Sequence, residues 1–335
     1  MSTIQQYQTA LQGGPSSLIT VPSPIPGPNE VCIQPRAVAV NPIDWKNVQF
    51  GATVQSWPAV LGIDGAGIVE SVGSGVTVFK AGDEVISYAN GIIGKGSWAD
   101  VYTVPENYVA RKPEKLSWEE AVSLPIAYLT AAATIRVGLK IQLPGLSRIP
   151  DSNAPKSVLV LGGSSSVGSA AIQLLRLALP SVHIVATSSA QHHPHLKSLG
   201  ASECLDRSAQ DDDAALKAET PDGAGFDAII DAVGACTSSP TVYAALRVHG
   251  PRLCAAVVTG PPATFPAGVQ GTLVGGQDFL DAEGEAMPYL ARLVDEGKYT
   301  LPVKVEVLGK GWDKIDVGLA RYPVGVSGAK MIVSL

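Results

Sequence analysis

The sequence predicts an α/β protein with two domains: a doubly wound parallel sheet and a smaller, β-rich domain. The chain has 335 residues, and at about 150 residues per domain this length favours two domains. From residue 157 onward, apolar strand-like runs alternate with helical stretches, which is typical of parallel strands joined by crossover helices. The first third of the chain instead shows short β-branched runs between Gly and Pro, as in antiparallel sheets.

Composition excludes several classes of protein. Hydrophobic residues make up 46% of the chain and charged residues 16%, which excludes a disordered chain. The 35 Gly follow no three-residue period, so a collagen helix is also excluded. With 24 Lys and Arg against 30 Asp and Glu, the net charge is -6, and a nucleic-acid partner has no bulk electrostatic support.

The chain shows no evident targeting or membrane signal. No Lys or Arg precedes Arg36, and the first residues form no compact apolar run, so neither a signal nor a transit peptide is indicated. The uncharged stretch 253–277 is interrupted by Pro and Gly, which is unlike a membrane helix. The four Cys are widely spaced, which favours a reducing compartment. We expect a cytoplasmic protein without membrane contact.

The elements of the β-rich domain lie at both ends of the chain. Near the N-terminus, strands are predicted at 30–34, 36–40, 67–72 and 83–87. Ser117, followed three residues later by Glu120, is a capping-box pattern that opens a helix running toward Leu124 and places a hinge there.

The C-terminal tail returns to β-like runs at 303–307 and 330–334, around a helix predicted over 312–322. We therefore expect the tail to complete the first domain. The predicted domains are 1–124 with 286–335, and 125–285.

The parallel domain begins after an exposed connection predicted over 142–156. Strands are expected at 158–161, 183–187, 226–231 and 252–258, with a helix after the first strand up to Leu179 and another over 242–248. This alternation predicts a doubly wound sheet.

A Gly/Ser loop over 162–168 directly follows the first of these strands and precedes a helix. In that place, free backbone N–H groups and the helix dipole can hold a pyrophosphate. Read from Gly163, the dinucleotide fingerprint has Ser165 where its middle Gly is expected. The alternative is an ordinary strand-to-helix turn, and the surrounding alternation favours dinucleotide binding.

The end of the second strand suggests which dinucleotide binds. A site for NAD carries Asp or Glu there, whereas this chain has Ser188 and Ser189. Three His and Lys197 follow within nine residues, so a 2′-phosphate meets no repulsive carboxylate. The sequence therefore favours NADPH, although the His cluster is equally explained as a solvated helix start.

Five motifs in order resemble the medium-chain dehydrogenase/reductase superfamily across nearly the whole chain. They are 41–46 (NPIDWK), 58–67 (PAVLGIDGAG), 81–85 (AGDEV), 96–102 (GSWADVY) and 326–333 (VSGAKMIV). The resemblance implies a Rossmann domain and a GroES-like catalytic domain. Within the superfamily the chain is similar to the quinone-reductase-like branch, and particularly to the trans-acting enoyl reductases of fungal polyketide pathways, which have a similar Pro-rich insertion after Leu143 and a similar loop start.

The metal ligands of the zinc-dependent members are missing at the corresponding positions. Asn41 stands in place of the Cys ligand, Gly62-Ile63-Asp64 stands in place of Gly-His-Glu, and no Cys lies between Cys32 and Cys204. We expect a zinc-independent enzyme, with Asp64 in a structural role. Reduction of an activated C=C bond remains feasible without a Lewis acid, because charge spreads into an enolate.

The resemblance implies Lys46, Thr130 and Tyr128 as catalytic candidates, with Asp44 as a charge partner. Lys46 and Thr130 match positions near the nicotinamide and substrate, and Tyr128 is a weaker candidate for the proton donor. Alternatively, Lys46 is an exposed lysine and Thr130 bonds the helix backbone. Residues 47–50 lack the catalytic Tyr of mitochondrial-type enoyl thioester reductases, which disfavours a dedicated fatty-acid enzyme.

Beyond the loop and the end of the second strand, the resemblance implies further cofactor contacts at Val233, Gly234, Val257, Val258, Leu273 and Lys330, although each of these is also explicable as core or turn. Together the predicted cofactor residues are Gly162, Gly163, Ser164, Ser165, Ser166, Val167, Gly168, Ser188, Lys197, Val233, Gly234, Val257, Val258, Leu273 and Lys330.

The sequence thus predicts an NADPH-dependent reductase acting on an α,β-unsaturated thioester or carbonyl in fungal secondary metabolism. A quinone or small-enone reductase is the alternative enzyme, and a non-catalytic NADPH-binding partner of a synthase is the alternative from another class. The expected substrate is a small or carrier-bound enoyl compound, with a polyketide synthase as a possible partner. The chain is expected to be a monomer or homodimer.

Overall fold

The computed structural model describes residues 2–89, 96–148, 154–258 and 263–335. The chain divides into two compact units. Unit 1 comprises Met1–Ile126 and Glu285–Leu335, and unit 2 comprises Ala127–Gly284. These boundaries lie within two residues of those expected from the sequence, and the predicted connection over 142–156 lies partly outside the described residues.

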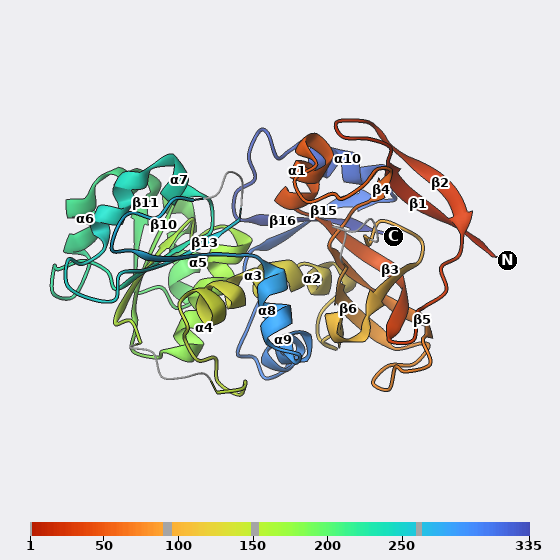
Figure 1. Ribbon diagram of the computed structural model, residues 1–335, viewed down its shortest axis with the longest axis horizontal. Helices are drawn as coiled ribbons and strands as arrows, with labels where there is room; N and C mark the ends of the chain where they lie inside the picture. The colour runs from red at the N-terminus through yellow and green to blue at the C-terminus, as the bar shows by residue number, and fades with distance from the viewer. Residues whose placement is uncertain (1, 90–95, 149–153, 259–262) are drawn as a thin grey trace. The chain divides into compact units, whose positions relative to one another are not determined.

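Unit 2 contains a six-stranded, entirely parallel sheet, so the predicted doubly wound Rossmann sheet is confirmed (Figure 1). The strand order is β11-β10-β9-β12-β13-β14, and the order reverses between β9 and β12. The strands are β9 (Ser157–Leu161), β10 (His183–Ser188), β11 (Glu203–Asp206), β12 (Ala228–Asp231), β13 (Leu253–Val257) and β14 (Gln270–Val274).

Helices α4 (Ser166–Ala178), α5 (His193–Ser198), α6 (Asp213–Ala218) and α7 (Ala235–Ser238) lie between consecutive strands of this sheet. Helix α8 (Gly276–Ala282) follows its last strand, β14. Every residue of β9 is buried, as expected for a central parallel strand covered on both faces. The helix predicted over 242–248 is wrong, because a 3₁₀ turn, Pro240–Ala245, occupies that segment. Pro240 favours the start of such a turn because its ring fixes φ.

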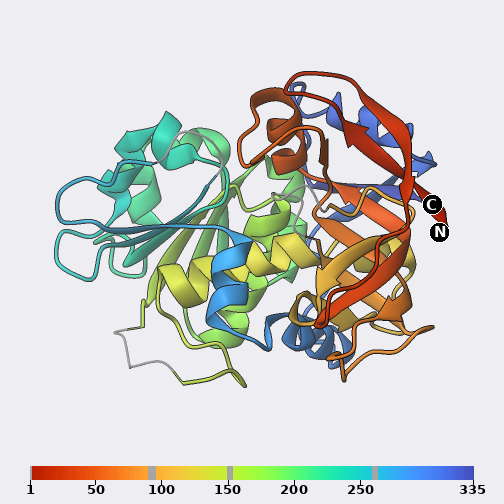
Figure 2. The same cartoon turned by 45° about the vertical axis from the view of Figure 1, so that its right-hand side comes forward.

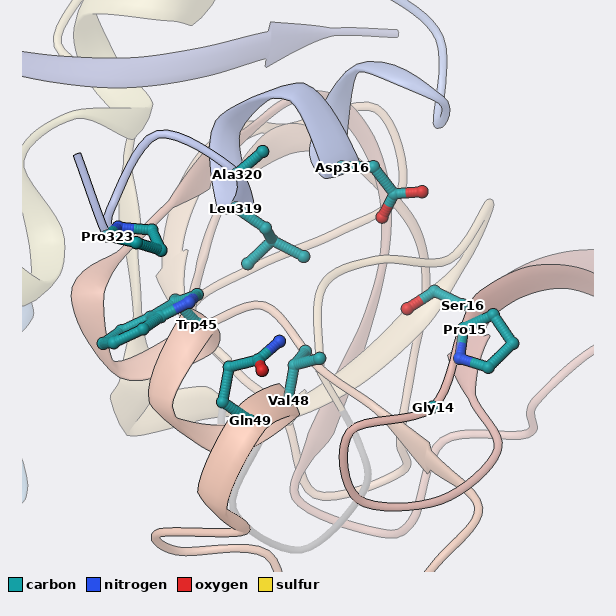
Figure 3. Close-up of a pocket in the computed structure, with 10 residues that line it drawn as sticks. All are labelled: Gly14, Pro15, Ser16, Trp45, Val48, Gln49, Asp316, Leu319, Ala320 and Pro323. Atoms are coloured by element: carbon teal, nitrogen blue, oxygen red, sulfur yellow. The ribbon is translucent and has the colours of Figure 1, made fainter.

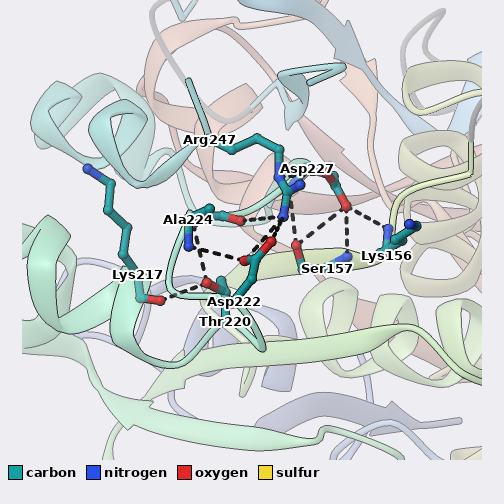
Figure 4. Close-up of polar contacts among 9 residues, drawn as sticks. Lys156, Ser157, Lys217, Thr220, Asp222, Ala224, Asp227 and Arg247 are labelled. Atoms are coloured by element: carbon teal, nitrogen blue, oxygen red, sulfur yellow. Dashed lines mark hydrogen bonds and ion pairs between the residues drawn. The ribbon is translucent and has the colours of Figure 1, made fainter. Parts of the chain in front are cut away.

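The amino ends of β9 and β12 are joined by one buried carboxylate (Figure 4). Asp227 Oδ2 accepts from the backbone N–H groups of Lys156 and Ser157, at 2.6 and 3.1 Å. Asp227 Oδ1 lies 2.9 Å from Arg247 Nε in an ion pair. These contacts fix the register of the two central strands at the edge opposite their carboxyl ends.

Unit 1 is built on a seven-stranded sheet with the path β15-β16-β3-β5-β6-β8, from which β7 branches at β3. The strands are β3 (Glu30–Val40), β5 (Asp64–Val72), β6 (Glu84–Tyr88), β7 (Tyr102–Pro105), β8 (Val109–Arg111), β15 (Lys304–Lys310) and β16 (Ala329–Ser334). The two strands expected around Pro35 are one strand, β3, whose pairing with β5 shifts register there. A bulge accommodates the proline, which cannot donate to the ladder.

The C-terminal tail supplies two strands to this sheet. Strand β16 pairs antiparallel with β3, so the blue end of the chain lies beside an N-terminal strand (Figure 2). The helices of unit 1 are α1 (Pro42–Phe50), α2 (Trp118–Val122), α9 (Ala286–Asp295) and α10 (Lys314–Leu319), and α10 is shorter than the predicted 312–322.

A second, three-stranded sheet in unit 1 was not predicted. It has the order β2-β1-β4, from β1 (Thr3–Thr9), β2 (Ser16–Pro22) and β4 (Ala59–Val60). Its first strand has the polar sequence TIQQYQT, of which only Ile4, Tyr7 and Thr9 are buried. Because apolar residues are sparse in this segment, its pattern did not predict a strand.

The helices between residues 118 and 138 span the point in the chain where unit 1 ends and unit 2 begins. The capping box at Ser117 is confirmed, because Ser117 Oγ accepts from Glu120 N and Glu120 bonds back to Ser117 N. Helix α3 (Pro125–Ala133) follows and continues into a π-helical turn, Thr134–Gly138. By length and composition the stretch Trp118–Gly138 could cross a membrane, but 89% of its most apolar window is buried inside the structure, as in a core helix.

Candidate active site

The predicted phosphate loop lies at the point where the strand order of unit 2 reverses. The loop leaves the carboxyl end of β9, and Val233 and Gly234 follow the carboxyl end of the neighbouring β12. In doubly wound sheets ligands bind at this crevice, outside the carboxyl ends of the strands. The structure thus brings together two segments that are about seventy residues apart and that both carry predicted cofactor contacts.

Two glycines keep this loop narrow. Gly162 has φ +73°, and a Cβ there would lie 2.3 Å from Val233 Cγ1. A Cβ on Gly168 would lie 2.3 Å from the Gly162 carbonyl oxygen. Larger residues would force the strand, the loop and the first helical turn apart, which is the role that glycines take in dinucleotide loops.

Ser165, which replaces the middle glycine of the fingerprint, caps the following helix. Its φ is −71° and its Oγ accepts from Gly168 N at 3.0 Å. Helix α4 therefore begins at Ser166, inside the segment predicted as loop up to Gly168. From the sequence alone, the Ser165 hydroxyl could bond within a turn or cap the following helix. The hydrogen bond from Gly168 N shows that it caps the helix.

The residues at this helix start fit a pyrophosphate. Ser165, Ser166 and Val167 are partly exposed and belong to the first turn of a 13-residue helix, where backbone N–H groups lack helical partners. The glycines bring the strand end and this helix start close together, so the N–H groups lie at the carboxyl edge of the sheet. NAD or NADP bound here would supply the hydride-carrying nicotinamide, and the chain would hold the phosphates.

The second strand ends at Ser188, as predicted, but the Ser188 side chain is only 1% exposed. Its Oγ donates to the Ser189 carbonyl at 3.2 Å, and His193 Nε2 lies 3.3 Å from the Ser188 carbonyl oxygen. Burial and the neighbouring His195, His193 and Arg207 lower the pKa of His192. Basic groups therefore gather beside the strand end.

Lys197 is engaged by another residue in this structure. Its ammonium lies 2.9 Å from Glu203 Oε2, and both side chains are about half exposed. A role at a 2′-phosphate therefore requires that this exposed pair opens, which such pairs do at little cost. Arg207, which the sequence analysis did not select, lies near His192 and Asp206.

The remaining predicted cofactor residues lie along the same sheet, except for one. Val257 ends β13, Val258 N donates to Val274 O at 3.1 Å, and Leu273 pairs with Ala256 inside β14. Lys330 instead belongs to β16 of unit 1, where its side chain is 4% exposed.

Sequence reasoning missed one buried acid beside the loop. Asp231, at the end of β12, is fully buried and accepts from the backbone N–H groups of Val233, Ala235 and Cys236, at 3.1, 3.0 and 2.7 Å. It thereby holds the turn with Gly234 at φ +78° and starts α7. An Asp three residues before a Gly, at the end of an apolar strand, was the available signal.

In unit 1, the motif at 41–46 opens α1 and carries the candidate Lys46. Asn41 is the N-cap, and Asp44 Oδ2 accepts from Asn41 N at 2.8 Å in a capping box. Lys46 is half-buried, and this burial lowers the pKa of its ammonium group. A lysine with a lowered pKa gives up its proton more readily than a solvated one.

Asp44 is fully buried, and its second oxygen, Oδ1, has no hydrogen-bond partner among the described residues. Burial and the nearby Asp64 raise the pKa of Asp44 to about 7, against the lowering effect of the bonds to Asn41. Asp44 thus bonds Asn41, the cap of its own helix. A pairing of Asp44 with Lys46 stays a prediction.

A buried network surrounds Asp64 at the positions that zinc-dependent relatives use for the metal. Asp64 Oδ2 accepts from Lys330 Nζ at 3.0 Å and from Asn41 Nδ2 at 3.1 Å, and Lys330 Nζ also donates to Asn41 Oδ1. Asp64 Oδ1 accepts from the backbone N–H of Ile126 at 2.9 Å. Ile126 is the last residue of the first segment of unit 1.

This donor set does not fit a zinc ion. One amide and one carboxylate supply too few ligands, Ile63 supplies none, and the Lys330 ammonium already provides the positive charge between them. The described residues contain no group of three or more His, Cys, Asp or Glu that could hold a metal.

The other two catalytic candidates, Tyr128 and Thr130, lie on α3 in unit 2. Tyr128 is fully buried, and its ring packs edge-on against Phe279 with centroids 5.9 Å apart. Thr130 is 5% exposed and lies in the second turn of α3, not at its start. Lys46 belongs to unit 1, so its approach to these two residues stays a prediction.

The sheet topology and the glycine-containing loop together are those of a dinucleotide-binding domain, and the similar proteins are oxidoreductases. Two family models match the chain: the alcohol dehydrogenase GroES-like domain over residues 27–114 and the zinc-binding dehydrogenase over residues 166–276. A solved structure of an NAD-dependent alcohol dehydrogenase superposes with a TM-score of 0.79, at 26% identity, and the match covers 99% of each chain.

Two curated relatives narrow the class. The trans-enoyl reductase himH of Aspergillus japonicus is 31% identical, over 91% of this chain and 90% of its own. The chloroplast envelope quinone oxidoreductase homolog of Arabidopsis thaliana is 33% identical over 85% of both chains. The chain belongs to the medium-chain dehydrogenase/reductase family, in its quinone-reductase-like branch, which confirms the resemblance seen in its motifs.

Proposed function

We propose that this oxidoreductase uses NADPH to reduce an activated C=C bond, with hydride added to the β-carbon of an α,β-unsaturated thioester or carbonyl. The observation that carries the proposal is the network of Lys330, Asp64 and Asn41. It replaces a metal site with a buried ion pair, so the chain lacks the Lewis acid with which an alcohol or simple ketone is activated. Likeness to a trans-enoyl reductase over nine-tenths of the chain supports the same chemistry.

Lys46 is the residue we assign to the developing enolate. Its ammonium group is half-buried, and a partly desolvated cation stabilises negative charge on an oxygen better than a solvated one. Thr130 is assigned to the nicotinamide carboxamide, because a hydroxyl in the second turn of α3 can donate to a carbonyl. Tyr128 is the less favoured proton donor, since its ring is fully buried against Phe279.

The preference for NADPH over NADH follows from charge at the end of β10. Ser188 and Ser189 place hydroxyls instead of a carboxylate at the end of β10, and His192 lies among His193, His195 and Arg207. The nearby carboxylate of Asp206, the register partner of Ser188 on β11, is held by Ser208 and lies near His193 and Arg207. A 2′-phosphate adjacent to these groups gains charge-assisted hydrogen bonds. Lys197 joins them when its exposed pair with Glu203 opens.

A quinone or small-enone reductase is the second candidate, and it is favoured by the 33% identity to a quinone oxidoreductase homolog. A quinone is also an activated acceptor and needs no metal. A third possibility, an NADPH-binding partner of a synthase without turnover, shares the loop geometry. We place the substrate as a small or carrier-bound enoyl compound of a polyketide pathway, and the chain as a monomer or homodimer.

One assay separates the three candidates. NADPH consumption is followed by absorbance with crotonyl thioester and with a benzoquinone side by side, in the presence of a metal chelator. Turnover of the thioester, unaffected by the chelator, is the expected result. Turnover of the quinone alone would favour the second candidate, NADPH binding without turnover would favour the third, and loss of activity on chelation would overturn zinc independence.

A further inference from the structure

A pocket of about 390 Å³ lies wholly within unit 1, on the face of α1 that carries Trp45 (Figure 3). That volume is within the range of small-molecule sites. Its walls come from three segments: the loop that joins β1 to β2, one face of α1, and α10 with the residues after it. Trp45, Val48 and Gln49 follow helical spacing on α1, and Asp316, Leu319 and Ala320 do so on α10.

The lining is mainly apolar, with the Gln49 amide between Trp45 and Val48, and it has a polar end at Asp316. Figure 3 shows Trp45 and Pro323 at one end, Leu319 and Val48 between, and Asp316 at the other end near Ser16. A ligand that fits this arrangement has an apolar body and one polar head. An aromatic body suits the Trp45 indole, because aromatic pairs stack edge-on or offset.

The polar end carries an exposed carboxylate that is held in place by one hydrogen bond. Tyr7 Oη donates to Asp316 Oδ2 at 2.6 Å. Burial, and the negative charge of Asp316, raise the pKa of Tyr7, so the phenol keeps its proton and keeps donating. The neighbouring Asp313 pairs with Lys314 at 2.6 Å, whereas no ion pair reaches Asp316 among the described residues.

We propose that this pocket binds a small primary amine with an apolar, preferably aromatic, body. The ammonium group of the ligand would bond Asp316, and its body would lie along Leu319 toward Trp45. A charged head is favoured over a neutral one because hydrogen bonds between ions are roughly twice as strong as neutral ones. The test of this proposal measures binding alone, so it does not depend on turnover.

The test is calorimetric titration of the full chain with three probes of matched shape: 2-phenylethylamine, 2-phenylethanol and 3-phenylpropanoate. The expected result is binding of the amine about two- to fivefold more tightly than the alcohol, as for an exposed ion pair, with the acid binding more weakly than either. Asp316→Asn should remove the preference for the amine. Asp313→Asn is the matched control, since it removes an acid from beside the same helix but outside the pocket lining, and it should keep the preference.

A filling variant tests the location. Ala320→Trp places a large side chain in the pocket from an exposed position, and it should abolish binding of both amine and alcohol. Equal affinity of the native chain for amine and alcohol would overturn the proposal. So would an amine preference that survives both Asp316→Asn and Ala320→Trp.

Discussion

Lys46 combines a half-buried position with a lowered pKa, on a helix whose cap is locked into the buried network of unit 1. We expect Lys46→Ala to lower turnover about ten- to a thousandfold, as when one preorganised donor is lost. NADPH affinity should change little, because the predicted phosphate contacts lie in unit 2. Steady-state kinetics and cofactor titration measure both quantities. The exposed Lys115→Ala is the control, and unchanged turnover in Lys46→Ala would refute the assignment.

Ser188 ends the second parallel strand, where a carboxylate would meet the 2′-phosphate of NADPH. We expect Ser188→Asp to weaken NADPH binding and strengthen NADH binding, through repulsion in one case and hydrogen bonds to the ribose in the other. Fluorescence titration with both cofactors measures the change. A gain in NADH affinity cannot come from misfolding. Ser181→Asp, an exposed position before the same strand, should change neither affinity.

Asp44 links stability to pH. Burial raises its pKa to about 7, so its favourable contribution to folding is complete below the unfolded pKa of about 3.9 and is lost as the pH rises through 7. Asp44→Asn has no titrating group at this position, so it does not lose stability as the pH rises, and its amide oxygen can still accept from Asn41 N. The difference in melting temperature, variant minus native, should therefore increase from pH 5 to pH 8.

Thermal unfolding followed by circular dichroism at several pH values checks this expectation. Glu114→Gln removes one negative charge from an exposed position and controls for a general effect of net charge. A difference in melting temperature that stays constant with pH would show that Asp44 is not the titrating group.

At the scale of elements, the phosphate loop depends on close approach between β9 and the start of α4. A Cβ on Gly168 would lie 2.3 Å from the Gly162 carbonyl oxygen. We expect Gly168→Ala to destabilise the chain by about 1–3 kcal/mol, as overpacking does. It should also weaken NADPH binding, because the helix start shifts away from the anion.

Urea unfolding and NADPH titration measure these two effects. The matched control is Gly284→Ala, since a Cβ there meets no atom within 4 Å and its backbone is not left-handed. If Gly168→Ala bound NADPH as the native chain does, the loop would not be the phosphate site.

At the scale of the whole molecule, a buried ion pair joins the two ends of unit 2. Arg136, on the π-helical turn after α3, pairs with Glu283 at the end of α8, 147 residues later. Ser147 bonds both partners. Loss of one partner leaves a buried charge, so Arg136→Met should cost about 3–5 kcal/mol of unfolding free energy.

The double variant Arg136→Met with Glu283→Leu should recover part of that loss, because no unpaired charge remains. Lys217→Met, which breaks a partly exposed pair with Asp213, should cost only about 0.3–0.5 kcal/mol. Chemical unfolding measures all three variants. A cost for Arg136→Met as small as that for Lys217→Met would contradict the structural importance of the buried pair.

The sequence by itself determined the features whose signals are local. The capping box at Ser117 depends on residues three apart, and the buried run of β9 followed by Gly162 depends on one strand and one turn. Such patterns predict helices, strands and turns because the hydrogen bonds and side-chain spacing that favour each element involve residues close together in the sequence. The helix expected over 242–248 failed for the same local reason, since Pro240 favoured a 3₁₀ turn.

Only the tertiary structure decided which distant residues meet. Lys330 was expected at the cofactor, yet its ammonium bonds Asp64 and Asn41, which are 266 and 289 positions away. The pocket at Asp316 and the turn held by Asp231 likewise join elements that no local pattern connects. A buried charge takes whichever partner the packed chain brings within hydrogen-bond distance, because leaving it unpaired costs several kcal/mol, and that choice is made by the whole fold.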